Sequence, residues 1–331
     1  KAGESPAVHP FAGIFTRLTP HLGQLDAFLR AQLAAFEPEI RSMADYCIDT
    51  SGKRIRPALV FLSGWRASGE IRPEMVRVAA VVELVHLATL VHDDIIDDAD
   101  VRRGRKAVHS QWGNDVTVLA GDFLYIKSMA MALSQDTLDI VRMLCDVTLH
   151  MIEGELYQLT KNGVVDLTEE EHLDIISRKT AYLFAGSTKI GGMLGEASRE
   201  QLDALWDYGF NIGMAFQLVD DLLDYTATAD QMGKNAGDDL REGKPTLPLI
   251  YLLRNGTEEQ RALVRQAIEQ GGTEHFDAIF AAIQASGALE YTRQAAEREA
   301  AAAETAANAL PPSLFRQTLI DLCAFSLQRQ S

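Results

Sequence analysis

Two aspartate clusters limit what this chain can fold into more than any other feature. One spans Asp93–Asp98 (DDIIDD) and the other Asp220–Asp224 (DDLLD), and each ends a long apolar run. Carboxylates four residues apart share one face of a helix, where their like charges repel, so they need a counter-charge. Oxygen ligands suit hard ions such as Mg²⁺, which takes one or two carboxylates and leaves its other positions to water and substrate phosphates. The alternative, a pair of solvated acidic helix ends, fits poorly with the apolar surroundings.

Composition allows one large core and excludes several classes of protein. The chain has 331 residues, 47% of them hydrophobic, and no linker or low-complexity tract divides it. We therefore expect one domain over residues 1–331, with residues 1–10 as a flexible N-terminal segment. A net charge of −16 leaves no overall basic field for a nucleic-acid partner. Three widely spaced cysteines fit neither a disulfide framework nor a zinc site, and the N-terminus has no signal-peptide pattern, so we expect a cytoplasmic protein.

Hydrophobic periodicity predicts helices almost throughout the chain. Apolar residues recur at helical spacing from Leu22 to Phe36 and from Leu202 to Phe216. Start and stop signals agree with this: capping boxes at Thr168, Ser198 and Thr257, and helix stops at Asn255-Gly256 and Gly271-Gly272. We predict an all-α fold, a single large bundle of ten or more helices around a central cavity.

The two clusters then mark the ends of two long helices. One helix is expected to begin near Pro73 and the other near Ser198. If these helices are neighbours, the clusters face each other across the mouth of the cavity. Apolar stretches such as Val78–Leu90 are too short to cross a bilayer and contain Glu83 and His86, so no transmembrane segment is expected.

Basic residues lie near both clusters in this acidic chain. Gly52–Pro57 (GKRIRP) opens a helix, Arg102 and Arg103 follow the first cluster, and Lys179, Lys234 and Lys244 flank the second. Any one of them alone would be read as a solvated surface charge. Together they favour a polyanion held partly by metal and partly by Arg and Lys, and a diphosphate satisfies both requirements.

At this point the chain resembles the trans-type isoprenyl diphosphate synthases, from about Gly52 to the C-terminus. The motifs that carry the resemblance are Gly52–Pro57, the first cluster with Arg102-Arg103-Gly104, Gly121–Phe123, Glu153–Glu155 with Gln158, Lys179–Ala181, Phe216-Gln217 before the second cluster, Gly233–Asn235, and Gly243–Thr246. Within the family the chain is most similar to the bacterial octaprenyl diphosphate branch, notably at Ala88–His92 and Gly237–Lys244. One departure is Thr50-Ser51, where a longer glycine run often precedes the lysine.

The resemblance implies two substrates, isopentenyl diphosphate and an allylic diphosphate such as farnesyl diphosphate, with three Mg²⁺ ions and a homodimer. Metal ligands are expected at Asp93, Asp97 and Asp220, with Asp94, Asp221, Asp224 and Asp238 as secondary or water-mediated ligands. The allylic diphosphate is expected to contact Arg102, Lys179, Gln217, Lys234 and Lys244. Isopentenyl diphosphate is expected to contact Lys53, Arg56, His86 and Arg103, whereas His92 is expected to be structural. Lys179, Thr180 and Gln217 resemble the catalytic residues that line the carbocation.

Product length is expected to depend on the depth of the pocket behind the first cluster. One helical turn rises about 5.4 Å, close to one isoprene unit, so Ala88 and Thr89 are the first possible obstruction. Short-chain members of the family commonly carry an aromatic residue there, so these small side chains indicate a long product. Met129 resembles the bulky stop of long-chain members, with Leu84 and Leu133 beside it, although Met129 could equally be a core methionine.

We therefore expect a prenyltransferase that makes octaprenyl diphosphate for quinone side chains. Geranylgeranyl or nonaprenyl products, or a non-catalytic partner subunit of a prenyl synthase, remain alternatives. A class I terpene cyclase needs no second diphosphate site and usually carries an Asn/Ser/Glu pattern as its second metal motif. A di-iron protein is suggested by Glu83-Leu84-Val85-His86, but the sequence has no second E-x-x-H.

Overall fold

The computed structural model describes residues 12–34, 37–49, 52–64, 72–135, 138–226, 237–271, 274–312 and 314–329. The predicted flexible segment 1–10 lies outside these residues, and so does Lys234.

The described chain is helical, apart from one short hairpin. The elements of its first half are α1 (Ala12–Thr16), α2 (Thr19–Leu33), α3 (Pro38–Asp49), α4 (Ile55–Gly64), α5 (Pro73–Ile96), β1 (Val101–Arg102), β2 (Arg105–Lys106), α6 (Val108–Trp112), α7 (Asn114–Leu133) and α8 (Leu138–Lys161). Those of its second half are α9 (Glu169–Ile176), η1 (Ser177–Ala181), α10 (Tyr182–Leu194), α11 (Arg199–Leu223), α13 (Asp238–Arg241), α14 (Leu247–Asn255), α15 (Glu258–Gln270), α16 (Phe276–Ala285), α17 (Ala288–Asn308) and α18 (Leu314–Gln328). The prediction of an all-α bundle with ten or more helices is confirmed.

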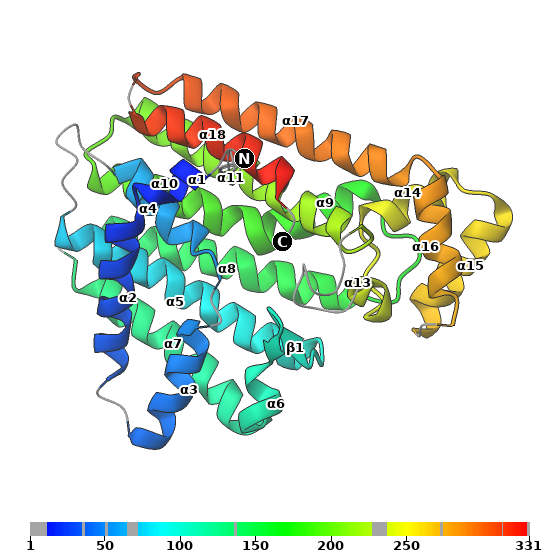
Figure 1. Ribbon diagram of the computed structural model, residues 1–331, viewed down its shortest axis with the longest axis horizontal. Helices are drawn as coiled ribbons and strands as arrows, with labels where there is room; N and C mark the ends of the chain where they lie inside the picture. Colours follow the sequence, from blue (N-terminus) through cyan, green and yellow to red (C-terminus); the bar gives the residue numbers. More distant parts are fainter. Residues whose placement is uncertain are drawn as a thin grey trace, which may run out of the picture.

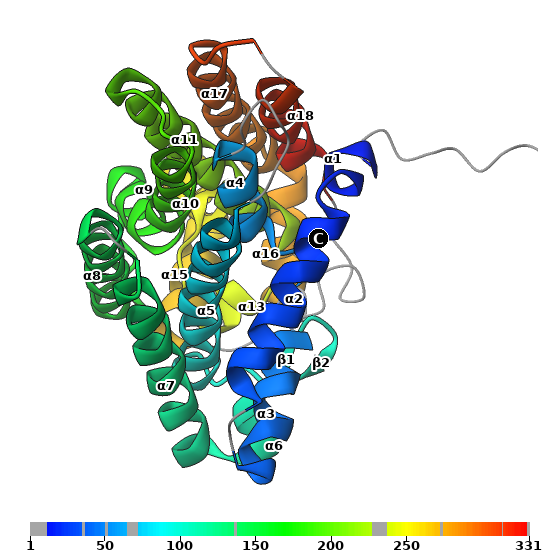
Figure 2. The ribbon, with the colours of Figure 1, turned by 90° about the vertical axis from the view of Figure 1, so that its left-hand side faces the viewer.

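Helix α5 forms the centre of the bundle. It packs against α2, α4, α7 and α10, while α11 packs against α10 and α17 (Figure 1). Viewed from the end of the bundle, other helices surround α5, and α7 and α8 lie at the outer edge (Figure 2). Side chains from Val78 to Ala88 are almost all inaccessible to solvent, which explains why α5 is apolar around most of its circumference. Because this helix is fixed on all sides, its last turn presents the first aspartate cluster in a defined position.

The predicted helix boundaries are confirmed at both clusters. Helix α5 begins at Pro73, where the fixed φ of proline suits the first turn, and ends at Ile96 within the first cluster. Helix α11 begins after Ser198, whose side chain forms a capping box with Gln201, and ends at Leu223 within the second cluster. The capping boxes predicted at Thr168 and Thr257 also form. Local sequence signals therefore position both clusters along their helices.

The β1–β2 hairpin follows directly after α5 and was not predicted. Asp98 has a φ of 51° and Arg103 a φ of 51°, both in the left-handed region that non-glycine residues rarely adopt. Asp98 ends the helix, and Arg103 with Gly104 forms the turn between the two strands. This tight reversal returns Arg102 and Arg103 to the end of α5 that carries the aspartates.

Helices α5 and α7 are long and apolar enough to span a membrane by length and composition alone. However, 78% of the apolar window of α5 is buried inside the bundle, as expected of a core helix, against 39% for α7. Exposed apolar side chains recur at heptad-like spacing along α7 and the adjacent α8. We call them the α7/α8 face: Val116, Leu119, Ile126 and Leu133 on α7, and Leu149, Ile152, Leu156 and Leu159 on α8.

Candidate active site

A cavity of about 730 Å³ lies between α5, α8, η1, α11 and the β1–β2 hairpin. Most of the predicted site residues line it: Lys53, Arg56, His86, Thr89, Asp93, Asp94, Asp97, Arg102, Arg103, Lys179, Thr180, Gln217, Asp220 and Lys244. Residues of both aspartate clusters therefore line one cavity, and α10 packs against both α5 and α11.

Asp93 and Asp97 project from successive turns at the end of α5 into the cavity. Burial raises the pKa of Asp93 well above its usual range; Lys179 opposes this shift, and the nearby charges of Glu155 and Asp97 add to it. A hydrogen bond joins Asp93 to Glu155. Burial also acts to raise the pKa of Glu155, but the charge of Lys179 and the bond from Asp93 outweigh it and lower that pKa. Carboxylates crowded in this way are stabilised by any cation that binds among them.

Two lysines already lie against these carboxylates. Lys179 Nζ is 3.0 Å from Glu155 Oε1, and Lys244 Nζ is 3.0 Å from Asp97 Oδ2 and 2.9 Å from Glu242 Oε2. Burial would lower the pKa of Lys244, but Asp97 and Glu242 outweigh it and raise that pKa. The Lys244 ammonium is therefore charged, and both lysines lie in the lining of the cavity.

The remaining predicted ligand of the first cluster, Asp94, faces the hairpin. Its carboxylate accepts two hydrogen bonds from Arg102, 2.8 Å from Nε and 2.7 Å from Nη2, and the residue is only 4% exposed. Bidentate pairs of this kind hold both groups in one orientation. Asp94 thus positions Arg102 at the edge of the cavity.

In the second cluster only Asp220 lines the cavity. Its Oδ1 lies 2.6 Å from Arg329 Nη2. Asp221 is 1% exposed and Asp224 fully buried, and neither reaches the cavity. The structure thus places Asp221 and Asp224 away from the cavity, and their expected role as secondary or water-mediated ligands stays a prediction. The physical reason is that successive helix residues diverge by about 100°, and that Asp224 caps α11 with its side chain packed inside.

Four cations of the cavity lining lie near Asp220, and we call them the basic cluster: Lys53, Arg56, Arg103 and Arg329. Burial lowers the pKa of Lys53, and the charges of Arg329 and Arg103 lower it further. Burial likewise lowers the pKa of Arg56 to about 10, an effect that Glu83 opposes and Arg103 reinforces. Cations that depress one another's pKa form a site that gains stability when a polyanion binds.

Aromatic rings support three members of the basic cluster. The Lys53 ammonium lies 5.3 Å from the centroid of Phe325, the Arg56 guanidinium 4.7 Å from Phe184, and the Arg329 guanidinium 4.5 Å from Phe216. Arg329 Nη2 also donates to the backbone carbonyl of Phe216. These contacts hold the cations in place, and Arg329 is paired in addition with Asp220.

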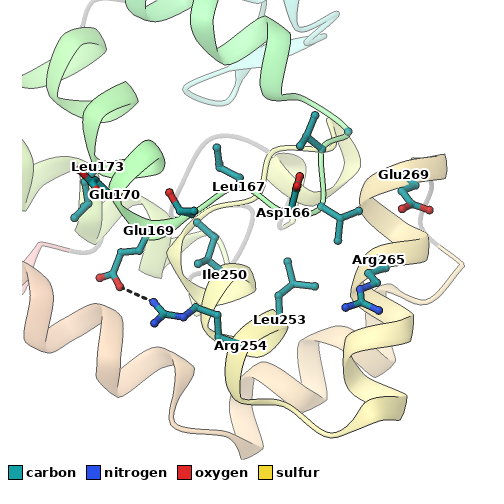
Figure 3. A pocket seen from close by; sticks show the side chains of 14 residues that line it. Asp166, Leu167, Glu169, Glu170, Leu173, Ile250, Leu253, Arg254, Arg265 and Glu269 are labelled. Carbon is teal, nitrogen blue, oxygen red and sulfur yellow. Dashed lines mark hydrogen bonds and ion pairs between the residues drawn. The ribbon is translucent and has the colours of Figure 1, made fainter.

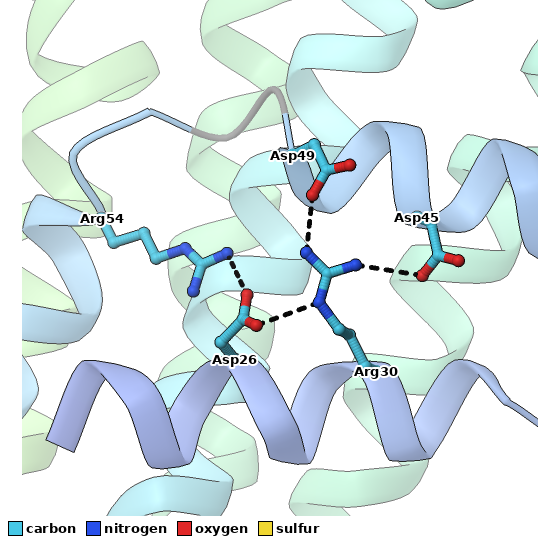
Figure 4. A network of polar contacts seen from close by, with 5 residues as sticks. All are labelled: Asp26, Arg30, Asp45, Asp49 and Arg54. Atoms are coloured by element: carbon cyan, nitrogen blue, oxygen red, sulfur yellow. Dashed lines mark hydrogen bonds and ion pairs between the residues drawn. The ribbon is translucent and has the colours of Figure 1, made fainter. Parts of the chain in front are cut away.

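A polar network at the surface fixes the loop that carries Lys53 and Arg56. Arg54 between them has a φ of 56°, and its Nη2 donates to Asp26 Oδ1 at 2.8 Å. The same carboxylate accepts from Arg30 Nε at 2.9 Å, and Arg30 also contacts Asp45 and Asp49, so the network joins α2 and α3 to the start of α4 (Figure 4).

Gly52 opens this loop with a φ of 83°. A Cβ there would collide with the guanidinium of Arg103, so only glycine lets the two halves of the basic cluster approach.

The two histidines of α5 make different contacts. His86 Nε2 lies 3.2 Å from Arg56 Nη1, and burial followed by the charge of Arg56 lowers the pKa of His86 well below its usual value. The neutral ring therefore accepts from Arg56 and orients it. His92 Nε2 lies 3.0 Å from the carbonyl oxygen of Val118 and ties α5 to α7. A Cβ on Gly121 would collide with the His92 ring, which accounts for the glycine there.

Lys179 and Thr180 lie in η1, a single turn of π-helix between α9 and α10. Such turns frequently occur at functional sites because the extra residue turns side chains out of the regular helical order. Thr180 Oγ1 donates to Gln217 Oε1 on α11 at 3.1 Å, and both residues line the cavity.

Comparison with known proteins identifies the family of the chain. The model of the polyprenyl synthetase family matches residues 37–284. The chain belongs to this family. Octaprenyl diphosphate synthase of Escherichia coli (strain K12) is 41% identical over 306 residues, which cover 92% of this chain and 94% of that protein. The all-trans-nonaprenyl-diphosphate synthase (geranyl-diphosphate specific) of Rhodobacter capsulatus is 37% identical over 92% of this chain and 94% of its own length.

The solved structures agree. Polyprenyl synthase of Caulobacter crescentus CB15, complexed with calcium and isoprenyl diphosphate, has a TM-score of 0.92 at 32% identity, covering 97% of this chain and 98% of that chain. The protein is therefore a prenyltransferase, a long-chain trans-polyprenyl diphosphate synthase.

The carboxylates of this cavity suit divalent metal ions whose remaining ligands come from a bound diphosphate. Among the described residues, no group of three or more His, Cys, Asp or Glu side chains could hold a metal ion on its own. Asp93, Asp97 and Asp220 supply single carboxylates from both sides of the cavity. Mg²⁺ bound in proteins characteristically takes one or two carboxylates and completes its shell with water and substrate phosphate.

The residues predicted to set chain length separate in the structure. Thr89 lines the cavity, but Ala88 is fully buried in the main core, and Met129 packs against that core without lining the cavity. Leu133, predicted to share the wall, is 61% exposed. The apolar part of the lining comes instead from α8 and its neighbours: Leu90, Tyr125, Met151, Ile152, Leu156, Leu159 and Leu183.

A second hollow, of about 1330 Å³, lies at the far end of the bundle between the 163–168 loop, α9, α14 and α15. It is larger but more open, and its lining is mainly apolar with scattered charges (Figure 3). Arg254 there is 3.3 Å from Glu169. Without gathered cations or paired carboxylates, this hollow has no chemistry for a diphosphate.

Sequence reasoning missed three residues of the site. Glu155 and Glu242 lie in quoted motifs, and their roles emerge only from their contacts with Lys179 and Lys244. Arg329 stands alone near the end of α18, more than a hundred positions from Asp220, and no local pattern marks it.

Proposed function

We propose that this synthase condenses isopentenyl diphosphate successively onto an allylic diphosphate such as farnesyl diphosphate, and that its product is octaprenyl diphosphate for quinone side chains. The observation that carries the proposal is the placement of two carboxylate sets and a separate basic cluster on one cavity. Two diphosphates of different fate require two sites of different chemistry.

Isopentenyl diphosphate is assigned to the basic cluster. Lys53, Arg56 and Arg103, with His86 orienting Arg56, supply charge-assisted donors, and Arg329 adds a fourth cation. Guanidinium groups suit this role because they bind phosphate oxygens in pairs.

The allylic diphosphate is assigned to the carboxylate side of the cavity, where Arg102, Lys179 and Lys244 lie. Lys234 is proposed there from the sequence pattern alone. Mg²⁺, three ions per site on the family pattern, would be held by Asp93, Asp97 and Asp220 and would stabilise the negative charge of the departing diphosphate.

The chemistry follows from this arrangement. The allylic C–O bond breaks and its electron pair leaves with the diphosphate, which Lys179 and Arg102 are placed to hold. The oxygens of Thr180 and Gln217 face the allylic cation as weak dipoles that do not trap it. The alkene of isopentenyl diphosphate supplies the electron pair of the new C–C bond, and a proton then passes from the adjacent carbon to an oxygen of the released diphosphate.

Product analysis tests this function. Purified protein, labelled isopentenyl diphosphate, farnesyl diphosphate and Mg²⁺ should yield a product that migrates as the C40 alcohol after dephosphorylation. A geranylgeranyl or nonaprenyl alcohol would correct the length. Absence of turnover would favour the non-catalytic partner subunit.

The α7/α8 face supports a homodimer. Leu119 is 68% exposed, Leu156 59% and Leu149 55%. Ile152 and Leu156 belong both to this face and to the cavity lining, so a second copy would complete the cavity wall. Light scattering should give a dimer, and Leu119→Lys with Leu149→Lys should give a monomer.

A cytoplasmic location is proposed on two observations. The three cysteines Cys47, Cys145 and Cys323 are free thiols, as a reducing compartment maintains them. The long apolar helix α5 is buried in the bundle.

A further inference from the structure

Asp221, the second aspartate of the Asp220–Asp224 cluster, does not line the cavity. It is hydrogen-bonded to a histidine that belongs to none of the family motifs named above. His172 on α9 lies with its Nε2 2.9 Å from Asp221 Oδ2. Their side chains are only 6% and 2% exposed. A buried carboxylate such as that of Asp221 needs hydrogen-bond partners for both of its oxygens.

The second oxygen of Asp221 supplies the link to the cavity. Gln217 Nε2 donates to Asp221 Oδ1 at 3.2 Å, one helical turn away on α11. Gln217 Oε1 in turn accepts from Thr180 Oγ1 at 3.1 Å. A continuous chain of hydrogen bonds thus runs from α9 through α11 to η1, and its last two members line the cavity.

The direction of these hydrogen bonds fixes which way the Gln217 amide dipole points. A carboxylate can only accept, so the amide nitrogen must face Asp221 and the amide oxygen must face Thr180. With Asp221 in place, the negative end of the amide dipole lies on the Thr180 side, where positive charge develops. An amide free to flip would present its N–H₂ group there instead, and the dipole would then oppose the reaction.

We propose that His172 is a positioning residue of the synthase, which acts through Asp221 to orient the Gln217 amide toward the allylic cation. This inference rests on the proposed function of the cavity. It gives the second aspartate of the cluster a role other than metal binding, and it accounts for a buried histidine that the sequence pattern leaves unexplained.

The test compares His172→Ala with His172→Gln, which keeps an N–H donor of similar reach, in single-turnover condensation of farnesyl diphosphate with isopentenyl diphosphate. We expect His172→Ala to lower the rate constant by about tenfold to a hundredfold, the range found when an outer partner that orients a functional side chain is removed. The KM of both substrates and the Mg²⁺ concentration for half-maximal rate should stay within about twofold of the wild type. His172→Gln should recover most of the rate.

His275→Ala is the matched control, because this residue lies at the start of α16, away from the chain of hydrogen bonds. Asp221→Asn provides an independent variant if His172→Ala does not fold, since it keeps the side-chain volume while removing one acceptor. It too should lose rate without changing the Mg²⁺ requirement.

Two outcomes overturn the inference. An unchanged rate constant in folded His172→Ala or Asp221→Asn protein would remove the positioning role. A large rise in the Mg²⁺ requirement of Asp221→Asn would return Asp221 to the metal ligands. Inactivity of the wild-type protein is a separate result, because it contradicts the proposed function and not the orientation of the amide.

Discussion

Replacing Arg56 with alanine is the sharpest test of how the cavity divides its two diphosphates. The guanidinium is partly buried, contacts His86 at 3.2 Å and stacks on Phe184 at 4.7 Å. It lies in the basic cluster, where the carboxylates that act on its pKa are Glu83 and Asp220. Its removal should therefore affect isopentenyl diphosphate far more than the allylic substrate.

The magnitude follows from the kind of contact that is lost. A charge-assisted hydrogen bond to phosphate contributes about 1.5–3 kcal/mol, which corresponds to about a tenfold to hundredfold rise in KM. Arg56→Lys keeps the charge but loses the paired donors, so it should fall between alanine and the wild type. Removal also deprives the buried Glu83 of a nearby positive charge, and a thermal melt should report the resulting loss of stability.

The assay measures initial rates of the first condensation, varying each substrate while the other is saturating. We expect the KM for isopentenyl diphosphate to rise and the KM for farnesyl diphosphate to change by less than about threefold. Equal increases in both values would mean that the two sites are wrongly divided. A rise confined to farnesyl diphosphate would exchange their assignments.

Three further predictions concern metal, product length and stability. Asp93→Ala and Asp220→Ala should each lower turnover by several orders of magnitude while the protein stays folded, whereas near-normal activity that still needs Mg²⁺ would contradict their assignment as ligands. Thr89→Phe places a ring where the cavity lining passes the first cluster and should shorten the product to about three or four isoprene units; a full-length product would show that the chain grows along another path. Hydrogen bonds from Lys161, Tyr157 and Thr168 lower the pKa of Glu171 from 4.5 to about 2. The stabilisation from this carboxylate should therefore be complete above pH 4.5 and disappear as the pH falls toward 2. The difference in melting temperature between the wild type and Glu171→Gln should shrink over that window.

Sequence patterns predicted those parts of the fold that depend on local interactions. The capping boxes at Thr168, Ser198 and Thr257 form as expected, because each needs only side chains within one helical turn. The positions of both aspartate clusters at helix ends followed from the same logic. The shared cavity was expected only if α5 and α11 were neighbours, whereas in the structure α10 packs against both helices and brings their ends to one cavity.

The side-chain positions that the sequence did not predict have a common cause, since each depends on a contact between distant segments. Asp224 follows Asp220 at the spacing that predicts one face, yet its side chain is packed inside the bundle. Ala88 was expected to be a first possible obstruction in the pocket, but the neighbouring helices cover it completely. Arg329 joins the site only because α18 returns across α11. Helical spacing gives the relative directions of side chains, and only the packing of other helices decides which direction leads to a cavity.

The distribution of charge explains how one cavity can treat two diphosphates differently. The allylic diphosphate must leave, and its bond breaks more easily when divalent metal and cations neutralise the departing charge. The diphosphate of isopentenyl diphosphate must stay attached until the new bond has formed. A site made of Lys53, Arg56, Arg103 and Arg329 binds that group through side chains held on aromatic rings. On the proposed assignment, Asp93 and Asp97 would direct metal to the allylic diphosphate, and ionisation would be confined to the substrate whose bond must break.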